Sequence, residues 1–150
     1  MDRTAIFVDA GYLFAQGSVV LTGSKKTRPS LSMDNAAVLE ELITVAAAKT
    51  RNIPLLRIYW YDGAIGYKGP TIEQATLAQL DNVKVRLGFV NSSGQQKGVD
   101  SLIVTDMIEL ARLGAITDAV LMSGDEDVRI GVQIAQTFGV RVHLLGITPS

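Results

Sequence analysis

Two spacings of hydrophobic positions alternate along this chain. Short continuous apolar or β-branched runs predict five buried strands, at residues 5–8, 55–61, 83–90, 119–122 and 140–145. Apolar positions at helical spacing predict helices at residues 34–51, 71–80, 98–113 and 127–138. Ser32 or Asp34 is the expected N-cap of the first of these helices. Before it we expect a short helical turn at Tyr12–Phe14 and a Gly-, Ser- and Thr-rich loop at residues 17–32.

Strands that alternate with helices predict an α/β fold with a mainly parallel five-stranded sheet covered on both faces. In such sheets ligands bind beyond the carboxyl ends of the strands. The candidate positions for a site are therefore those that follow the predicted strands: Asp9, Asp62, Asn91 and residues 123–125. A length of 150 residues suits a single domain over residues 1–150 and leaves open a C-terminal region outside this chain.

The residue inventory excludes several kinds of chemistry. The chain has no Cys and a single His, which rules out disulfides, thiolate nucleophiles, Cys-based zinc sites and multi-His metal sites. That residue, His143, lies inside the fifth predicted strand, a position typical of a packed or surface histidine. Any catalysis must therefore use carboxylates, hydroxyls, Lys or Arg, and Asp is twice as frequent as Glu.

Charge and hydropathy narrow the range of partners. The formal net charge is −1, so the chain has no overall basic character. No apolar run is long enough to span a bilayer and no secretory signal is present, which favours a cytoplasmic protein without a membrane partner. No G-x-G-x-x-G motif follows the first strand and there is no P-loop, so we expect no nucleotide cofactor.

Acidic residues gather after the first and fourth predicted strands. Asp9 suits either the cap of the next helical turn or a site carboxylate. Residues 123–127, Ser-Gly-Asp-Glu-Asp, contain a Ser-x-x-Glu capping pattern that needs neither Asp125 nor Asp127. Two carboxylates ~4 Å apart repel by about 4 kcal/mol at an effective dielectric of ~20, whereas a helix N-terminus offsets about 0.3–1 kcal/mol per charge. A bound cation would balance the remainder.

The predicted helix at residues 98–113 places two further acids on its buried side. At 100° per residue, its polar arc holds Ser101, Thr105, Glu109 and Arg112. Asp100 and Asp106 fall in the arc that faces the sheet, where each must be paired, protonated or metal-bound. Asp100, in the first turn, can reach the strand ends. Asp106 lies about 9 Å further along the helix axis and suits a supporting or pairing role.

Four acids from three elements are therefore expected at one edge of the sheet: Asp9, Asp100, Asp125 and Asp127. Oxygen ligands without His or Cys suit Mg²⁺ or Mn²⁺ rather than zinc. Carboxylates that hold such ions support the attack of a metal-activated water on a phosphodiester. Asp106 and Ser123 are expected to adjoin and support this set.

Three segments carry a resemblance to a known family. They are residues 6–13 (Ile-Phe-Val-Asp-Ala-Gly-Tyr-Leu), residues 97–100 (Lys-Gly-Val-Asp) with Asp106, and residues 123–127. In this order they resemble the NYN domain, in the LabA-like branch of the PIN-like nucleases. The resemblance implies a three-layer α/β/α sandwich, a Mg²⁺ or Mn²⁺ site at the acidic cluster and ribonuclease activity. This chain has Tyr12 where many relatives carry Asn, and Val128 where many carry an aromatic residue.

RNA as the substrate requires phosphate or base contacts near the acids. The candidate residues for these contacts are Tyr12, Lys25, Lys26, Arg28, Lys97 and Arg129. The basic loop that holds three of them suits a solvated surface equally well. Trp60, Tyr61 and Tyr67 are candidate stacking surfaces, although at least one of the first two suits core packing better. A homodimer is left open.

Two other functions would use the same acids. One is a metal-binding but non-catalytic module for RNA or a protein partner, and Tyr12 is the only residue that points toward it. The other is a Toprim-like phosphotransfer domain, which shares the later Asp-x-Asp but would need a Glu after its first strand.

Overall fold

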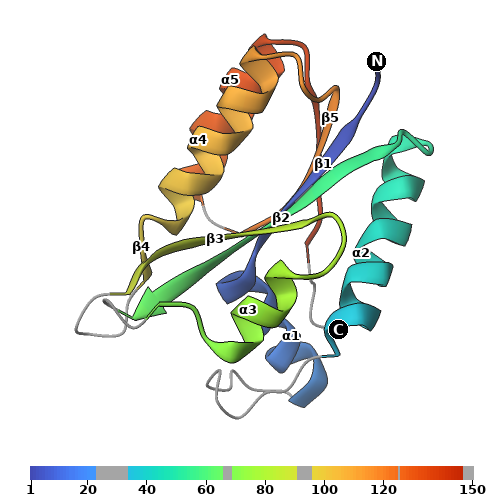
Figure 1. Ribbon diagram of the computed structural model, residues 1–150. Helices are drawn as coiled ribbons and strands as arrows, with labels where there is room; N and C mark the ends of the chain where they lie inside the picture. Colours follow the sequence, from blue (N-terminus) through green and yellow to red (C-terminus); the bar gives the residue numbers. More distant parts are fainter. Residues whose placement is uncertain (23–33, 66–68, 91–95, 125, 147–150) are drawn as a thin grey trace.

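The computed structural model describes the backbone of residues 1–22, 34–65, 69–90, 96–124 and 126–146 (Figure 1). Within these ranges the side chains of residues 17–22, 65, 89–90, 96–97 and 127 are outside the description. The strands are β1 (Thr4–Asp9), β2 (Leu55–Ile65), β3 (Val83–Val90), β4 (Gln96–Lys97), β5 (Asp118–Met122) and β6 (Arg141–Leu144). The helices are α1 (Ala10–Thr22), α2 (Asn35–Thr50), α3 (Ile72–Ala78), α4 (Val99–Arg112), the short 3-10 helix η2 (Glu126–Val128) and α5 (Arg129–Thr137).

The strands form one sheet in the order β4-β3-β2-β1-β5-β6. Five of them are parallel, which confirms the predicted mainly parallel five-stranded sheet. The sixth, β4, is two residues long and pairs antiparallel with β3, in a segment where the sequence predicted a polar turn. Helices α4 and α5 cover one face of the sheet, and α1, α2 and α3 cover the other (Figure 1). The three-layer α/β/α sandwich is therefore confirmed.

The central strand β1 shows why its sequence is apolar without interruption. Ala5 and Phe7 belong to the core under α4 and α5, whereas Ile6 and Val8 belong to the core under α1, α2 and α3. All four side chains are fully buried. A strand with helices on both faces must be apolar on both sides, which a continuous apolar run provides.

Helix α1 is longer than the sequence predicted. It extends through Thr22, so the expected loop is wrong for residues 17–22, and the rest of that loop at residues 23–33 lies outside the described residues. Gly17 and Ser18 have low helix propensity, which is why the pattern favoured a loop. Burial of Phe14 anchors the preceding turn, and each further residue then adds a helical hydrogen bond to a nucleus already formed.

The predicted helices that became α2, α3 and α4 agree with the structure to within about two residues at each end. Asp34 caps α2 by accepting a hydrogen bond from the Ala37 N–H at 3.1 Å, which confirms one of the two expected caps. Among the described residues, no helix is both long enough and apolar enough to cross a bilayer.

The last helix begins later than the sequence predicted. The 3-10 turn η2 precedes it, and the N-cap of α5 is Val128, which makes no side-chain cap hydrogen bond. The Ser-x-x-Glu pattern is therefore not the capping box of this helix. Glu126 forms an ion pair with Arg129 at 2.7 Å instead, across the junction of η2 and α5.

Candidate acidic site at the strand ends

Strand register brings together the acidic segments that follow the first and fourth predicted strands, β1 and β5. Val8 of β1 lies opposite Met122 of β5, so Asp9 and Ser123 are the next positions on two neighbouring parallel strands. The Asp9 side chain is 9% exposed, and its Oδ1 accepts a hydrogen bond from the Tyr12 backbone N–H at 3.2 Å. Asp9 therefore caps α1, and at the same time it places a buried carboxylate at the carboxyl end of the central strand.

Helix α4 presents the arcs that its sequence predicted. Its buried residues are Val99, Ile103, Met107 and Ala111. Its exposed residues include Ser101, Thr105, Glu109 and Arg112. Asp100 is half-buried in the first turn, and Gly98 precedes it with φ +82°, a left-handed conformation that few residues other than glycine adopt. This glycine lets the chain turn from β4 directly into α4, with Asp100 at the helix start.

Asp106 has a partner set that no sequence pattern indicated. Its Oδ2 accepts hydrogen bonds from the Tyr61 hydroxyl at 3.0 Å and from Arg86 Nε at 3.0 Å. Its Oδ1 accepts a third from Arg86 Nη2 at 3.1 Å, so the guanidinium binds the carboxylate in a two-point arrangement. The expected supporting or pairing role of Asp106 thus has its physical partners in β2 and β3. Only the alternation of Lys84 and Arg86 with apolar residues in β3 hinted that a basic side chain faces this helix.

This network raises the pKa values of Tyr61 and Arg86. Burial first, and then the neighbouring Asp106 carboxylate, raise the pKa of the Tyr61 phenol well above its ordinary range. The hydrogen bond to Asp106 raises the pKa of the Arg86 guanidinium. Tyr61 and Trp60 are both fully buried, and Tyr61 stacks with Phe7 at a ring-centroid distance of 6.3 Å. Neither side chain offers a surface on which a base could stack.

The acids that follow Ser123 also belong to this edge. The turn η2, which contains Asp127, contacts α4, the helix that carries Asp100. Asp125 and the Asp127 side chain are outside the description. Among the side chains that are described, no three His, Cys, Asp or Glu residues converge on a common point. The structure thus places Asp9 and Asp100 on neighbouring elements at this edge, and the full set of four acids stays a prediction.

The predicted substrate-contact residues are described only in part. Lys25, Lys26 and Arg28 lie outside the described residues. The backbone of Lys97 is part of β4, but its side chain is not described. Arg129 is exposed at the start of α5. Tyr12 is half-buried beside Asp9.

Comparison with known proteins decides the family. The sequence matches the NYN domain over residues 3–150. The chain belongs to the NYN domain family. NYN domains are generally grouped with the PIN-like nucleases, whose members use divalent metal ions.

Other similarities concern this NYN domain's sequence and fold. It is 69% identical over 78 residues to the uncharacterized protein y4oD of Sinorhizobium fredii, a match that covers 52% of this chain and 36% of that protein. The chain thus spans only about a third of the length of this relative. A solved structure, the protein of unknown function VPA0982 from Vibrio parahaemolyticus, has a TM-score of 0.63 at 23% identity, covering 97% of this chain and 81% of that one. This similarity supports the fold alone.

Asp62 lies inside β2, which continues to Ile65, so the prediction that it follows the strand is wrong. It has a structural role in the NYN domain. It is 1% exposed, and its Oδ1 accepts the Gly63 N–H at 2.8 Å. Its Oδ2 accepts a hydrogen bond from Gln74 Nε2 at 3.0 Å, and Gln74 together with Thr71 forms the capping box of α3. Asp62 therefore ties β2 to the start of α3.

His143 is half-buried in β6 and pairs with a buried acid. Its Nε2 is 2.9 Å from Oδ2 of Asp118, the first residue of β5. Asp118 is 1% exposed and also accepts a two-point pair from Arg141. Since β5 is parallel to β1, this group sits at the amino ends of the strands, opposite the acidic edge.

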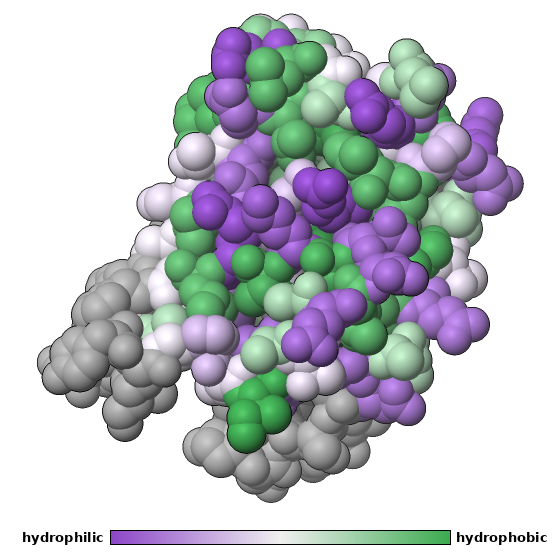
Figure 2. All heavy atoms as spheres, viewed as in Figure 1, coloured by the Kyte–Doolittle hydropathy of each residue, from purple (hydrophilic) through white to green (hydrophobic). Residues whose placement is uncertain are grey.

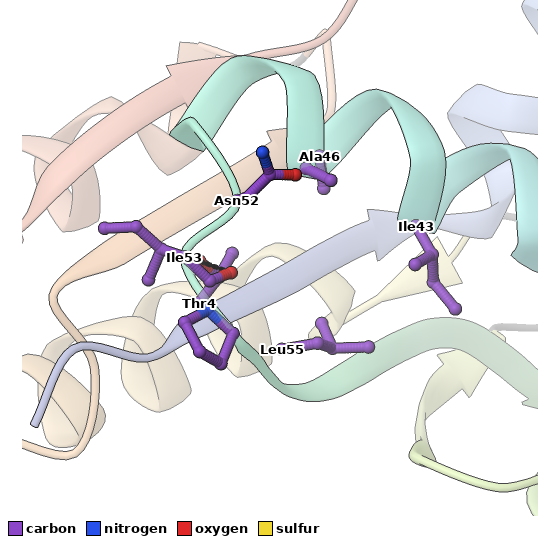
Figure 3. Close-up of a pocket in the computed structure, with 8 residues that line it drawn as sticks. Thr4, Ile43, Ala46, Asn52, Ile53 and Leu55 are labelled. Atoms are coloured by element: carbon purple, nitrogen blue, oxygen red, sulfur yellow. Dashed lines mark hydrogen bonds between the residues drawn. The ribbon is translucent and has the colours of Figure 1, made fainter.

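A small apolar pocket lies at the same amino end of the sheet (Figure 3). Its volume is about 190 Å³. It is lined by residues from the start of β1, from α2 and from the start of β2: Thr4, Ile43, Ala46, Ala47, Asn52, Ile53, Pro54 and Leu55. None of these lining side chains is titratable, so this pocket offers no acid, base or nucleophile.

Proposed function

We propose that this NYN domain is a metal-dependent ribonuclease that hydrolyses RNA phosphodiester bonds at the acidic edge of the sheet. The observation that carries the proposal is the position of Asp9. It is a buried carboxylate at the carboxyl end of the central strand, and Asp9 and Ser123 directly follow the paired residues Val8 and Met122. Strand ends of this kind are where parallel sheets bind ligands. Membership of the NYN family makes RNA phosphodiesters the first substrate to test.

The donor chemistry of the edge suits Mg²⁺ or Mn²⁺. Four carboxylates would hold the ion: Asp9, Asp100, Asp125 and Asp127. Hard oxygen donors without thiolate or imidazole are the ligands these ions prefer. When bound, such an ion supplies a nucleophilic hydroxide from water and stabilises charge on the phosphate.

The remaining residues would position the RNA and the acids. Asp106, held by Arg86 and Tyr61, braces α4 against β2 and β3 and so keeps Asp100 at the edge. Phosphate contacts are proposed for Lys25, Lys26, Arg28, Lys97 and Arg129. We also propose that residues 1–150 form one domain of the LabA-like branch and that this domain works in the cytoplasm. A direct measurement of mass in solution would show whether it forms a homodimer.

Cleavage of end-labelled RNA in Mn²⁺ or Mg²⁺ tests the proposal. Asp9→Asn and Asp125→Asn should each lower the rate by at least about a hundredfold, because each removes a charged metal ligand. Asp81→Asn, which changes an exposed acid between α3 and β3, is the matched control and should cleave at the natural rate. Cleavage that survives both site substitutions would remove the assigned site.

The thermal midpoint with and without Mn²⁺ tests metal binding separately from catalysis. Mn²⁺ at ~100 times its dissociation constant should stabilise the natural chain by about 2.7 kcal/mol, seen as a higher thermal midpoint, and should not stabilise Asp9→Asn to the same extent. An unchanged midpoint at millimolar Mn²⁺ argues against the metal site. Metal-dependent RNA binding without cleavage identifies the non-catalytic module instead.

A further inference from the structure

Tyr12 lies where three strand ends meet. Its backbone N–H donates to Asp9 Oδ1 at 3.2 Å, at the end of β1. Its ring covers Gly124, just beyond β5: a Cβ placed on Gly124 would stand 2.6 Å from Cε2 and 3.0 Å from Cδ2 of this ring. A Cβ on Gly146, just beyond β6, would stand 3.8 Å from the Tyr12 hydroxyl oxygen. Tyr12 thus lies beside the ends of β1, β5 and β6.

The need for glycine at position 124 comes from space, not from backbone conformation. Four other described glycines have positive φ values, between +70° and +90°, but Gly124 is outside the left-handed region. Real Cβ atoms essentially never approach another heavy atom as closely as 2.6 Å. With tyrosine at position 12, any side chain at position 124 would therefore displace either the ring or the Ser123–Gly124 segment.

We propose that Tyr12 is a positioning residue, size-matched to Gly124, that sets the spacing between the acid-bearing ends of β1 and β5. Its main chain orients the Asp9 carboxylate, and its ring fixes the Ser123–Gly124 segment relative to that carboxylate. The effect on metal binding rests on the proposed function, whereas the packing of residues 12 and 124 stands without it. Residues that orient ligands in this way typically change metal affinity about 10- to 100-fold when they are altered.

Mn²⁺ titration without RNA, followed by the electron paramagnetic resonance of the free ion, measures this effect. Gly124→Ala should bind Mn²⁺ about 10- to 100-fold more weakly than the natural chain, because the methyl group displaces the ring or the segment. In Tyr12→Ala/Gly124→Ala the methyl group has room, so affinity should rise again above that of Gly124→Ala alone. Asp81→Asn, a change at an exposed acid between α3 and β3, should bind Mn²⁺ as the natural chain does.

Gly131→Ala is the matched control for a glycine in a tight place. A Cβ at Gly131 would stand 3.1 Å from the Val104 Cα, between α4 and α5 and away from the strand ends. This variant should lower the thermal midpoint without changing the Mn²⁺ affinity of the folded protein. The control thus separates general destabilisation from loss of positioning.

Thermal unfolding of the same variants without metal tests the size match of residues 12 and 124 independently of the proposed metal site. The effects of Tyr12→Ala and Gly124→Ala on the midpoint should be non-additive, because the two residues are in contact. Additive midpoints, or a Gly124→Ala protein with natural stability and natural Mn²⁺ affinity, overturn the inference. If the natural chain binds no Mn²⁺, both the metal site and the effect of Tyr12 on it are contradicted. The thermal midpoints of the variants still test whether residues 12 and 124 are size-matched.

Discussion

Asp106 accepts one hydrogen bond from the buried Tyr61 hydroxyl and two from the Arg86 guanidinium, all at 3.0–3.1 Å. Its side chain is 17% exposed, against 36% for Arg86, so the carboxylate is the more buried partner. A half-buried carboxylate without a partner is costly. Arg86 therefore makes an acid on the sheet-facing side of α4 compatible with folding.

Arg86→Met should reduce the free energy of unfolding by about 1–2 kcal/mol, measured by denaturant titration at pH 7. The loss comes from leaving Asp106 without its cation, and solvent around the exposed part of Arg86 keeps it below that of a fully buried pair. The control is Arg112→Met, which breaks the exposed pair with Glu109 on the outer side of α4 and should leave stability unchanged. Equal losses in both variants would contradict this account.

Asp118 is a buried acid whose carboxyl has a lowered pKa. Burial alone raises the pKa of its carboxyl, but hydrogen bonds from Arg141, His143 and Thr117 together outweigh burial and lower the pKa below its ordinary value. The stability that these bonds contribute is complete above the unfolded pKa of about 3.9. It is lost as the pH falls through the lower folded value.

Asp118→Asn should therefore flatten the decline of unfolding free energy in acid, in the window from about pH 4 downward. Urea unfolding at a series of pH values measures this slope. Arg141→Met removes the cationic partner and keeps the carboxylate, so the pKa of the Asp118 carboxyl should be less depressed and the decline in acid should be shallower than in the natural chain. A slope in Asp118→Asn as steep as the natural one would show that other acids govern the acid transition.

At the scale of single elements, α3 illustrates how a short helix is held. Gln74 is 4% exposed, and its Nε2 donates to Asp62 Oδ2 at 3.0 Å and to the Gly63 carbonyl at 2.9 Å. Its Oε1 accepts the Thr71 N–H at 2.9 Å, which completes the capping box. A helix of seven residues has little stability of its own, and these contacts fix it to β2.

Gln74→Met should cost about 2–3 kcal/mol of unfolding free energy, because it leaves a buried carboxylate oxygen, a carbonyl and an N–H without this partner. Denaturant titration measures the loss. Gln79→Met, an exposed substitution at the C-cap of the same helix, is the matched control and should be close to neutral. A neutral Gln74→Met would mean that water replaces all three bonds.

At the scale of the whole molecule, the net charge hides a local concentration of acids. The proposed site gathers acids at the carboxyl ends of the strands, although the net charge of the chain is only −1. The remaining surface is therefore mildly basic. Figure 2 shows hydrophilic and hydrophobic residues intermixed over the face it draws.

The proposed phosphate contacts of the basic loop predict a salt effect. With metal chelated to prevent cleavage, replacing Lys25, Lys26 and Arg28 by Gln should reduce the slope of log K against log salt for single-stranded RNA by about 2. The control replaces three exposed basic residues toward the amino ends of the strands, Lys49, Arg51 and Arg57, with the same change in charge. Equal slopes in the two triple variants would assign binding to net charge alone.

Much of the fold follows from local sequence because its signals are local. Residues 5–8 predict a strand buried on both faces, and the structure buries both faces. The polar arc of residues 98–113 predicts which side of α4 is exposed. The predicted end of α1 was wrong because the low helix propensity of Gly17 and Ser18 is outweighed by the packing that anchors the preceding turn of the helix.

The sequence by itself determined the order of the five parallel strands and of the helices between them, the faces they bury and the place of Asp9 at the end of the first strand. These depend on hydrophobic periodicity and on neighbours a few positions away. Only the tertiary structure decided that Asp106 meets Tyr61 and Arg86, 45 and 20 positions away, and that the Tyr12 ring occupies the space Gly124 leaves. Such contacts depend on strand order and on the seating of helices over the sheet, and no local spacing in the chain encodes them.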